Sequence, residues 1–201
     1  MTGLLLRTGA APGTRGRSIL VTTLTAFVIV VALVAVERLA ELVISQRNAA
    51  WSFARGGHET GRGHYPVMVV LHTGFLVLMV VEAFARRPDV PAGLAWSMLI
   101  VVMAAQGLRW WCIATLGPQW NTRVIVVPGL PPVRSGPYRW LSHPNYVAVV
   151  VEGAALPLVH GSWMTAVGFT VANAAVLAVR LRVENAALAS LPRPSGRLAD
   201  A

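Results

Sequence analysis

Residues 143–185 read HPNYVAVVVEGAALPLVHGSWMTAVGFTVANAAVLAVRLRVEN, and they decide the fold class. Two apolar runs, Tyr146–Val159 and Trp163–Val179, lie on either side of a Gly161-Ser162 turn, which predicts a helical hairpin. The first run has 14 residues, or roughly 21 Å of helix, and is shorter than the ~30 Å core of a bilayer. The second run continues into polar residues 180–185, which predicts a helical extension beyond the membrane.

Three more apolar segments precede the hairpin, at residues 19–36, 66–84 and 94–116. Hydrophobic residues make up 55% of the chain and charged residues 12%, whereas a soluble domain carries about a quarter charged residues. The apolar residues come in long blocks separated by arginine-rich stretches, as in proteins that cross a bilayer. The sequence therefore predicts an all-α integral membrane protein with about five transmembrane helices, the last two forming the short hairpin.

The same pattern predicts the organisation of the chain. We expect a disordered basic tail over residues 1–18, a three-helix membrane part over 19–116, a part that carries the chemistry over 117–190, and a disordered tail over 191–201. Within these parts, residues 45–65 are predicted to form a polar loop. Arg123–Val127 is predicted to be a short β-like run, because it is rich in β-branched residues between turn-forming ones.

The 17 basic residues are all arginine and give the chain a net charge of +9. They lie at the ends of apolar segments and form no basic stripe with interleaved aromatics, which argues against nucleic acid as a partner and for membrane lipids. If the N-terminus is outside, ten arginines fall in inside segments and five in outside segments. The positive-inside rule then predicts that residues 117–143 and the C-terminus share the cytoplasmic face.

Two polar motifs stand out in the second half of the chain. In the first, residues 136–146, Pro144 suits the first turn of a helix, and a helix N-terminus favours an anionic group. In the second, residues 180–188, Arg180 and Glu184 are four residues apart, so they share a helix face and can pair. The predicted topology brings both motifs to one face of the membrane.

These motifs resemble the isoprenylcysteine carboxyl methyltransferase superfamily, and more specifically its bacterial branch associated with type III polyketide synthases. The resemblance rests on Gly136–Arg139 followed by His143–Tyr146, then a hairpin, then Arg180 with Glu184-Asn185. It extends over roughly residues 30–190, through further matching stretches at Glu37–Leu42, Ser45–Asn48, His64–Met68, Leu71-His72 and Leu116–Arg123.

The resemblance implies a methyltransferase of the bacterial inner membrane that uses S-adenosylmethionine at a site on the cytoplasmic side. No glycine-rich strand–turn–helix fingerprint of a Rossmann domain is present in the sequence, in keeping with this family. The matching positions imply cofactor-binding residues, namely Tyr138, Arg139, His143, Pro144, Tyr146, Glu184 and Asn185. Arg180 would face the acceptor and, with Glu184, is the predicted catalytic residue. The position of Asn185 is often a glutamate in the family.

The predicted acceptor is a lipophilic acid, with an alkylpyrone or alkylresorcinol-type polyketide as the first choice. A carboxylate or the acidic enol of a 4-hydroxy-2-pyrone is already an anion, so such an acceptor needs orientation by Arg180 rather than a strong base. Its alkyl part would enter sideways between helices. The alternatives are a protein S-isoprenylcysteine carboxylate as acceptor or, outside enzymes, a small membrane transporter or structural subunit. A phospholipid amine is a more distant possibility, against which Arg180 argues.

Several polar residues inside apolar segments have structural interpretations. Glu152 is either functional or paired with Arg109 or Arg180, and His72 is expected to bond to a neighbouring helix. Gln106 and Asn173 are expected to form interhelical hydrogen bonds, Glu37 and Glu41 to pair with Arg38 or Arg47, and Cys112 to be a packing residue. No metal is expected, because His58, Glu59 and His64 match no metal motif. The sequence predicts no oligomeric state.

Overall fold

The computed structural model describes residues 12–61, 63 and 65–189. Five α-helices, two short strands and two 3-10 turns are assigned in this part of the chain. In order they are α1 (Pro12–Phe53), β1 (His58–Thr60), α2 (Tyr65–Arg86), α3 (Ala92–Leu116), η2 (Gly117–Gln119), β2 (Val124–Val126), η3 (Gly136–Arg139), α4 (Pro144–Leu158) and α5 (Trp163–Ala189). The predicted all-α integral membrane fold is thereby confirmed, including the hairpin, which α4 and α5 form.

The long first helix corrects two predictions. Residues 12–18, predicted as disordered tail, and residues 45–53, predicted as loop, all belong to α1, which has 42 residues. The rest of the predicted N-terminal tail and the tail at 191–201 lie outside the described residues. From Arg17 to Phe53 the sequence holds no glycine or proline, so nothing breaks the helix until Gly56, which adopts a positive φ of 77°.

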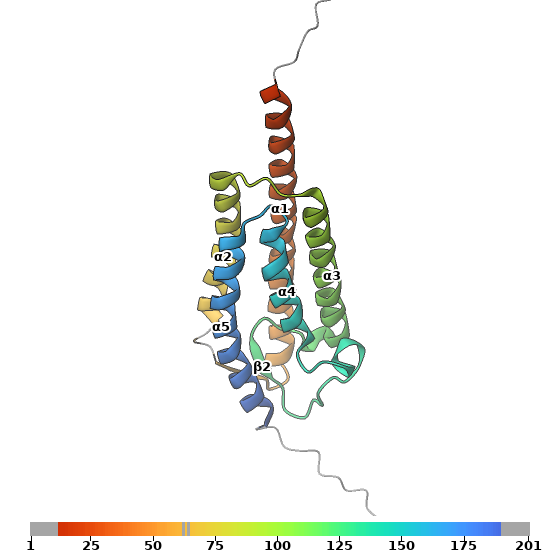
Figure 1. Ribbon diagram of the computed structural model, residues 1–201. Helices are drawn as coiled ribbons and strands as arrows, with labels where there is room; N and C mark the ends of the chain where they lie inside the picture. The colour runs from red at the N-terminus through yellow and green to blue at the C-terminus, as the bar shows by residue number, and fades with distance from the viewer. Residues whose placement is uncertain (1–11, 62, 64, 190–201) are drawn as a thin grey trace, which may run out of the picture.

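Helix α4 lies at the centre of the bundle, packed against α3 on one side and α5 on the other, while α5 also packs against α2 (Figure 1). The close approach of α4 and α5 depends on Gly153, since a Cβ there would lie 2.3 Å from the ring of Phe169. Phe27, Met79, Val102, Leu156 and Phe169 belong to the hydrophobic core that joins all five helices.

Three of the described stretches are long and apolar enough to cross a membrane, namely Tyr65–Arg86, Ala92–Gln119 and Trp163–Ala187. The 15 residues of α4 correspond to about 22 Å, so this helix is shorter than the bilayer core, as predicted. These helices define an integral membrane protein.

All the irregular structure that matters for the site lies at one end of the bundle. Helices α1, α3 and α5 run toward this end and α2 and α4 run away from it (Figure 1). The predicted β-like run is confirmed as β2, which pairs antiparallel with β1. We call this the loop end of the bundle.

Polar residues near the end of α1 hold the segment that follows α3. Asn48 donates hydrogen bonds to the carbonyls of Gly117 at 3.1 Å and Trp120 at 2.8 Å. The Ser45 hydroxyl lies 2.7 Å from that of Thr122 and accepts a hydrogen bond from its backbone N–H at 3.0 Å. Ser45 and Asn48 are therefore polar because they make contacts from a helix, not because they belong to a solvated loop.

Candidate active site

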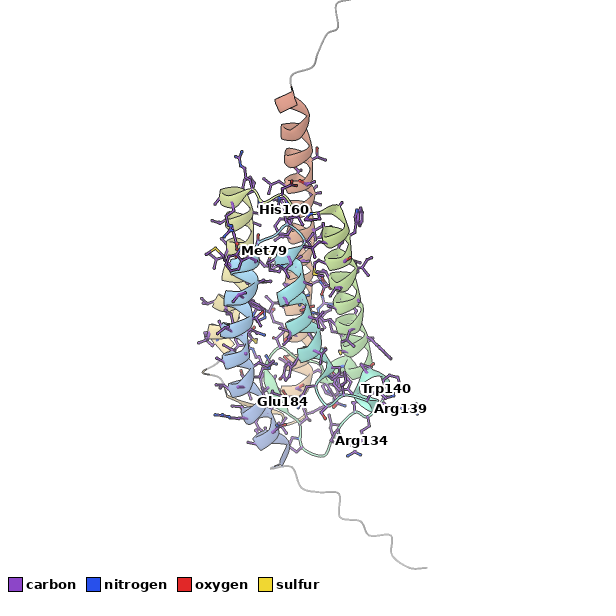
Figure 2. All side chains as sticks on the ribbon, viewed as in Figure 1. Met79, Arg134, Arg139, Trp140, His160 and Glu184 are labelled. Carbon is purple, nitrogen blue, oxygen red and sulfur yellow. The ribbon has the colours of Figure 1, made fainter. Side chains whose placement is uncertain are left out.

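A cavity of about 240 Å³ opens at the loop end between β2, the segment around η3, the start of α4 and the end of α5. Its volume is a little below the ~300–1,000 Å³ that small-molecule sites usually occupy. Both sequence motifs reach it, because Tyr138, His143 and Tyr146 line it from one side and Arg180 and Glu184 from α5. Figure 2 shows Glu184 at this end of the bundle, with Arg134, Arg139 and Trp140.

Four side chains in the cavity form a chain of contacts, which we call the cavity cluster: His143, Tyr146, Arg180 and Glu184. Arg180 donates from Nε to the Tyr146 hydroxyl at 2.8 Å, and that hydroxyl donates to the Glu184 carboxylate. The other carboxylate oxygen of Glu184 lies 3.7 Å from His143 Nδ1. The rings of His143 and Tyr146 stack with their centroids 5.2 Å apart. Two helices and the turn before α4 are thus joined at one place.

The buried Arg180 is held in position from a second side. Its Nη1 donates to the Met68 sulfur of α2 at 3.0 Å, and its guanidinium lies 5.5 Å from the centroid of the Tyr146 ring. Because a guanidinium stays protonated in proteins, this group places a fixed positive charge at the wall of the cavity.

Close packing against α3 positions the turn η3. Gly136 has a positive φ of 54°, and a Cβ there would lie 2.4 Å from the Thr115 hydroxyl and 3.1 Å from the Trp111 indole nitrogen. The Tyr138 hydroxyl makes a hydrogen-bonding contact with the Cys112 thiol. Burial, with smaller contributions from Cys112 and Glu184, raises the pKa of the Tyr138 phenol well above its ordinary value, so this group stays neutral and can donate a hydrogen bond.

The structure brings five of the eight predicted site residues to the cavity and leaves three outside its lining. Arg139 is exposed, with its guanidinium 5.8 Å from the centroid of the Trp140 ring. Pro144 is fully buried at the first position of α4, where it starts the helix, as its fixed φ suits. Asn185 is exposed on α5 beside Glu184.

Asn145 lines the cavity but was not among the predicted site residues. Its Oδ1 is buried and has no hydrogen-bond partner among the described residues. A buried acceptor of this kind is costly unless a donor reaches it, so a ligand that carries an N–H or O–H fits this position. The sequence feature that could have identified Asn145 as a site residue is its position inside the first motif, between His143 and Tyr146.

A second polar cluster lies inside the bundle, and we call it the bundle cluster: Glu37, Arg38, Glu41, Gln106, Arg109 and Glu152. Arg109 is hydrogen-bonded to Glu152, which confirms one of the two pairings predicted for this carboxylate. Arg38 donates to Glu41 and to Gln106, both at 2.9 Å, and Gln106 donates to Glu37. The predicted pairing of both α1 glutamates with Arg38 and the predicted interhelical bond of Gln106 are confirmed.

Two other predictions for intramembrane residues have different outcomes. His72 bonds through Nδ1 to the Met68 carbonyl of its own helix at 2.8 Å, so the predicted bond to a neighbouring helix is wrong. It contacts α5 instead through its ring, edge-on to Phe169 at 5.3 Å. Asn173 is buried between α4 and α5, and its interhelical bond stays a prediction. Among residues 12–61, 63 and 65–189, no group of three His, Cys, Asp or Glu could hold a metal.

The fold and the site together define an integral membrane protein with a polar, arginine-containing cavity at one end. A model of the isoprenylcysteine carboxyl methyltransferase (ICMT) family matches residues 98–190, which include the whole cavity cluster. The chain is also 33% identical over 162 residues to the uncharacterized protein YpbQ of Bacillus subtilis (strain 168), covering 81% of this chain and 96% of that protein. No solved structure matches the chain.

The chain belongs to the isoprenylcysteine carboxyl methyltransferase family, as its motifs predicted. It is therefore a membrane protein of a methyltransferase family.

Proposed function

We propose that the protein transfers a methyl group from S-adenosylmethionine to an acidic oxygen of a lipophilic acceptor. The observation that carries this proposal is the juxtaposition of Arg180 with Glu184 and His143 around one cavity at the end of a membrane bundle. The acceptor we favour is an alkylpyrone or alkylresorcinol-type polyketide. A prenylated cysteine carboxylate, the acceptor in the name of the family, is the alternative.

The donor set of the cavity suits S-adenosylmethionine. The Glu184 carboxylate can accept hydrogen bonds from ribose hydroxyls or from the ammonium group of the methionine part, and the orphaned Asn145 oxygen offers another acceptor. The stacked His143 and Tyr146 rings provide an aromatic surface for a base or a sulfonium. When bound, this cofactor supplies an electrophilic methyl group. The residues of the chain supply orientation and charge.

Arg180 is the residue that we assign to the acceptor. Its guanidinium attracts a carboxylate or an enolate oxygen and cannot act as a competing nucleophile, because it stays protonated. The bonds to Tyr146 and Met68 restrict the side chain to one place, which lowers the entropic cost of orienting the reacting oxygen. A carboxylate or the enol of a 4-hydroxy-2-pyrone is already an anion and needs no general base, so for these acceptors we assign no proton abstraction to His143.

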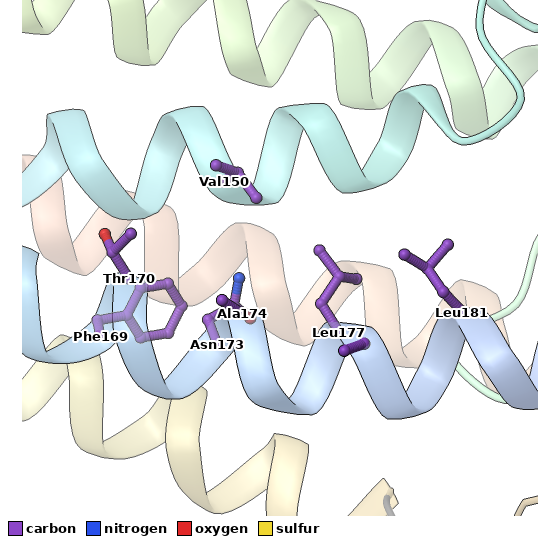
Figure 3. Close-up of a pocket in the computed structure, with 8 residues that line it drawn as sticks. Val150, Phe169, Thr170, Asn173, Ala174, Leu177 and Leu181 are labelled. Atoms are coloured by element: carbon purple, nitrogen blue, oxygen red, sulfur yellow. The ribbon is translucent and has the colours of Figure 1, made fainter.

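An apolar cavity of about 220 Å³ lies between α4 and α5 and suits the alkyl part of the acceptor. Leu177 and Leu181, which flank Arg180 along α5, line one end of it, and Phe169 lines the other end (Figure 3). A chain that enters from the bilayer would lie in this cavity with its polar head toward Arg180. We call it the α4/α5 groove.

We further propose that the loop end faces the cytoplasm from a bacterial inner membrane. Arg134 and Arg139 lie at that end, Arg123 and Arg180 line the cavity there, and positive charge is retained on the cytoplasmic side. The charged side chains of the bundle cluster form ion pairs with one another, so we regard a transporter as the weaker candidate.

A direct test is methyl transfer by purified protein from S-adenosylmethionine labelled in its methyl group. Three acceptors would be compared: an alkylated 4-hydroxy-2-pyrone, an S-prenylated cysteine derivative and a long-chain amine. We expect transfer to the pyrone in preference to the other two. Transfer to the cysteine derivative alone would replace our favoured acceptor with the alternative, and transfer to the amine would overturn the role of Arg180.

A further inference from the structure

The ring of Phe169 borders three separate cavities. Phe169 lines the α4/α5 groove, a small cavity of about 20 Å³ beside the bundle cluster, and a cavity of about 570 Å³ between α2 and α5. The side chain itself is buried, with 6% of its surface exposed. The ring is therefore a wall that the three cavities share, and we refer to it as the partition.

The neighbours of the ring hold it in this position. It packs against Phe75 of α2 with the centroids 4.0 Å apart, and against His72 edge-on at 5.3 Å. On the α4 side, Gly153 leaves room for it, since any Cβ would meet the ring at 2.3 Å. Contacts on both sides oppose rotation of the ring out of the partition.

The position of the ring along α5 gives the groove a length. Leu181 and Phe169 are twelve residues apart, which corresponds to about 18 Å of helix. An extended alkyl chain advances by roughly 1.3 Å per carbon, given carbon–carbon bonds of about 1.5 Å. The groove therefore accommodates roughly a dozen carbons between the region of Arg180 and the face of the ring.

We infer that Phe169 is a specificity-determining residue that ends the α4/α5 groove and so sets the chain length of the lipophilic acceptor. This inference rests on the proposed function for the identity of the acceptor. In the variant Phe169→Ala the groove would open into the larger α2/α5 cavity, and longer chains would gain a place to bind. Gly153 takes part as the residue that makes room for the ring.

The experiment uses the full-length protein in nanodiscs and alkyl carboxylic acids of 8 to about 20 carbons that carry a photoreactive group at the terminal carbon. In the unmodified protein, affinity should rise about fourfold per methylene up to roughly twelve carbons and then stop rising. Cross-links should fall near Thr170 and Val150. In Phe169→Ala the rise should continue for about four further carbons, and cross-links should move to Leu78 on α2.

The matched control is Val81→Ala, because Val81 lines the α2/α5 cavity, does not line the α4/α5 groove and is not one of the residues that hold the Phe169 ring. It should leave the chain-length limit unchanged. Phe169→Leu, a smaller loss of volume, provides a second variant if Phe169→Ala does not fold. The same chain-length limit in a folded Phe169 variant as in the unmodified protein would overturn the inference. Methyl transfer to the alkylated 4-hydroxy-2-pyrone is measured in parallel, so that a shifted limit without any transfer would contradict the proposed function alone.

Discussion

The bundle cluster and the cavity cluster are both built from arginine and glutamate, yet they differ in what surrounds them. In the bundle cluster the side chains of Arg109 and Glu152 are 6% and 7% exposed, and each contacts an opposite charge on another helix. In the cavity cluster the side chains of His143 and Glu184 are 24% and 29% exposed and border a cavity. Charged groups that pair across helices inside a membrane tie the helices together, whereas polar groups at the wall of a cavity of about 240 Å³ have room for a ligand beside them.

The largest effect should come from breaking the bundle cluster. The variant Arg109→Ala leaves the Glu152 carboxylate buried without its closest partner, which should cost about 3–5 kcal/mol of stability. Thermal unfolding of the detergent-purified protein measures this loss. Arg182→Ala, which removes an exposed arginine of α5, is the control and should leave the transition unchanged. Equal transitions in both variants would contradict a structural role for the bundle cluster.

Removing the positive charge from the cavity cluster should affect turnover rather than folding. We expect Arg180→Gln to lower methyl transfer by about 100-fold, or about 2.7 kcal/mol of transition-state stabilisation, because the acceptor oxygen loses its orienting charge. The affinity for S-adenosylmethionine should stay within twofold of its original value. Arg180→Gln protein that bound S-adenosylmethionine normally and kept full turnover would exclude our assignment.

Disturbing the apolar packing next to the bundle cluster should lower the stability of the protein somewhat less than breaking the ion pair does. In Gly153→Ala the new methyl group meets the Phe169 ring, and overpacking of this kind costs about 1–3 kcal/mol. Gly168→Ala on α5 is the matched control, since a Cβ there meets nothing within 4 Å. A Gly153→Ala protein that unfolds at the temperature of the Gly168→Ala protein would show that α4 and α5 can separate without cost.

The smallest expected effect is on cofactor affinity, and it distinguishes Glu184 from its neighbour Asn185 on α5. Glu184→Gln should weaken binding of S-adenosylmethionine about tenfold, or about 1.4 kcal/mol, because the carboxylate loses its charge toward the cofactor. Asn185→Ala should change binding less than twofold, since Asn185 is exposed outside the cavity lining. Titration calorimetry on both variants measures the difference. Stronger weakening in Asn185→Ala would favour the role that family resemblance implied for this residue.

The features of the fold that depend on local composition can be predicted from the sequence. Proline and glycine mark the ends of α2 and α4 and the turn before α5, and hydropathy marks the long apolar helices. The pairing of Glu152 was also predictable, since an intramembrane carboxylate requires a partner and few arginines are near it in the bundle. Which arginine pairs with Glu152 depends on the faces that α3 and α4 turn toward each other, and these faces cannot be read from a single sequence.

The prediction of a loop at residues 45–53 was wrong for a clear physical reason. Ser45 and Asn48 are polar because they bind the segment around Gly117–Thr122, which lies about 70 residues away in sequence. A local pattern cannot distinguish polarity that serves a distant backbone from polarity that faces water. The same applies to Arg139 and Asn185, since neighbours in a motif can point in different directions once the motif is folded.

Binding of S-adenosylmethionine to the detergent-purified protein, measured by calorimetry alongside His143→Ala, tests whether the loop-end cavity is a cofactor site. We predict micromolar binding of S-adenosylmethionine and of S-adenosylhomocysteine, weakened about tenfold by His143→Ala in a protein that unfolds at the same temperature. Absence of binding by well-folded protein, or binding that His143→Ala leaves unchanged, would contradict this assignment of the cavity.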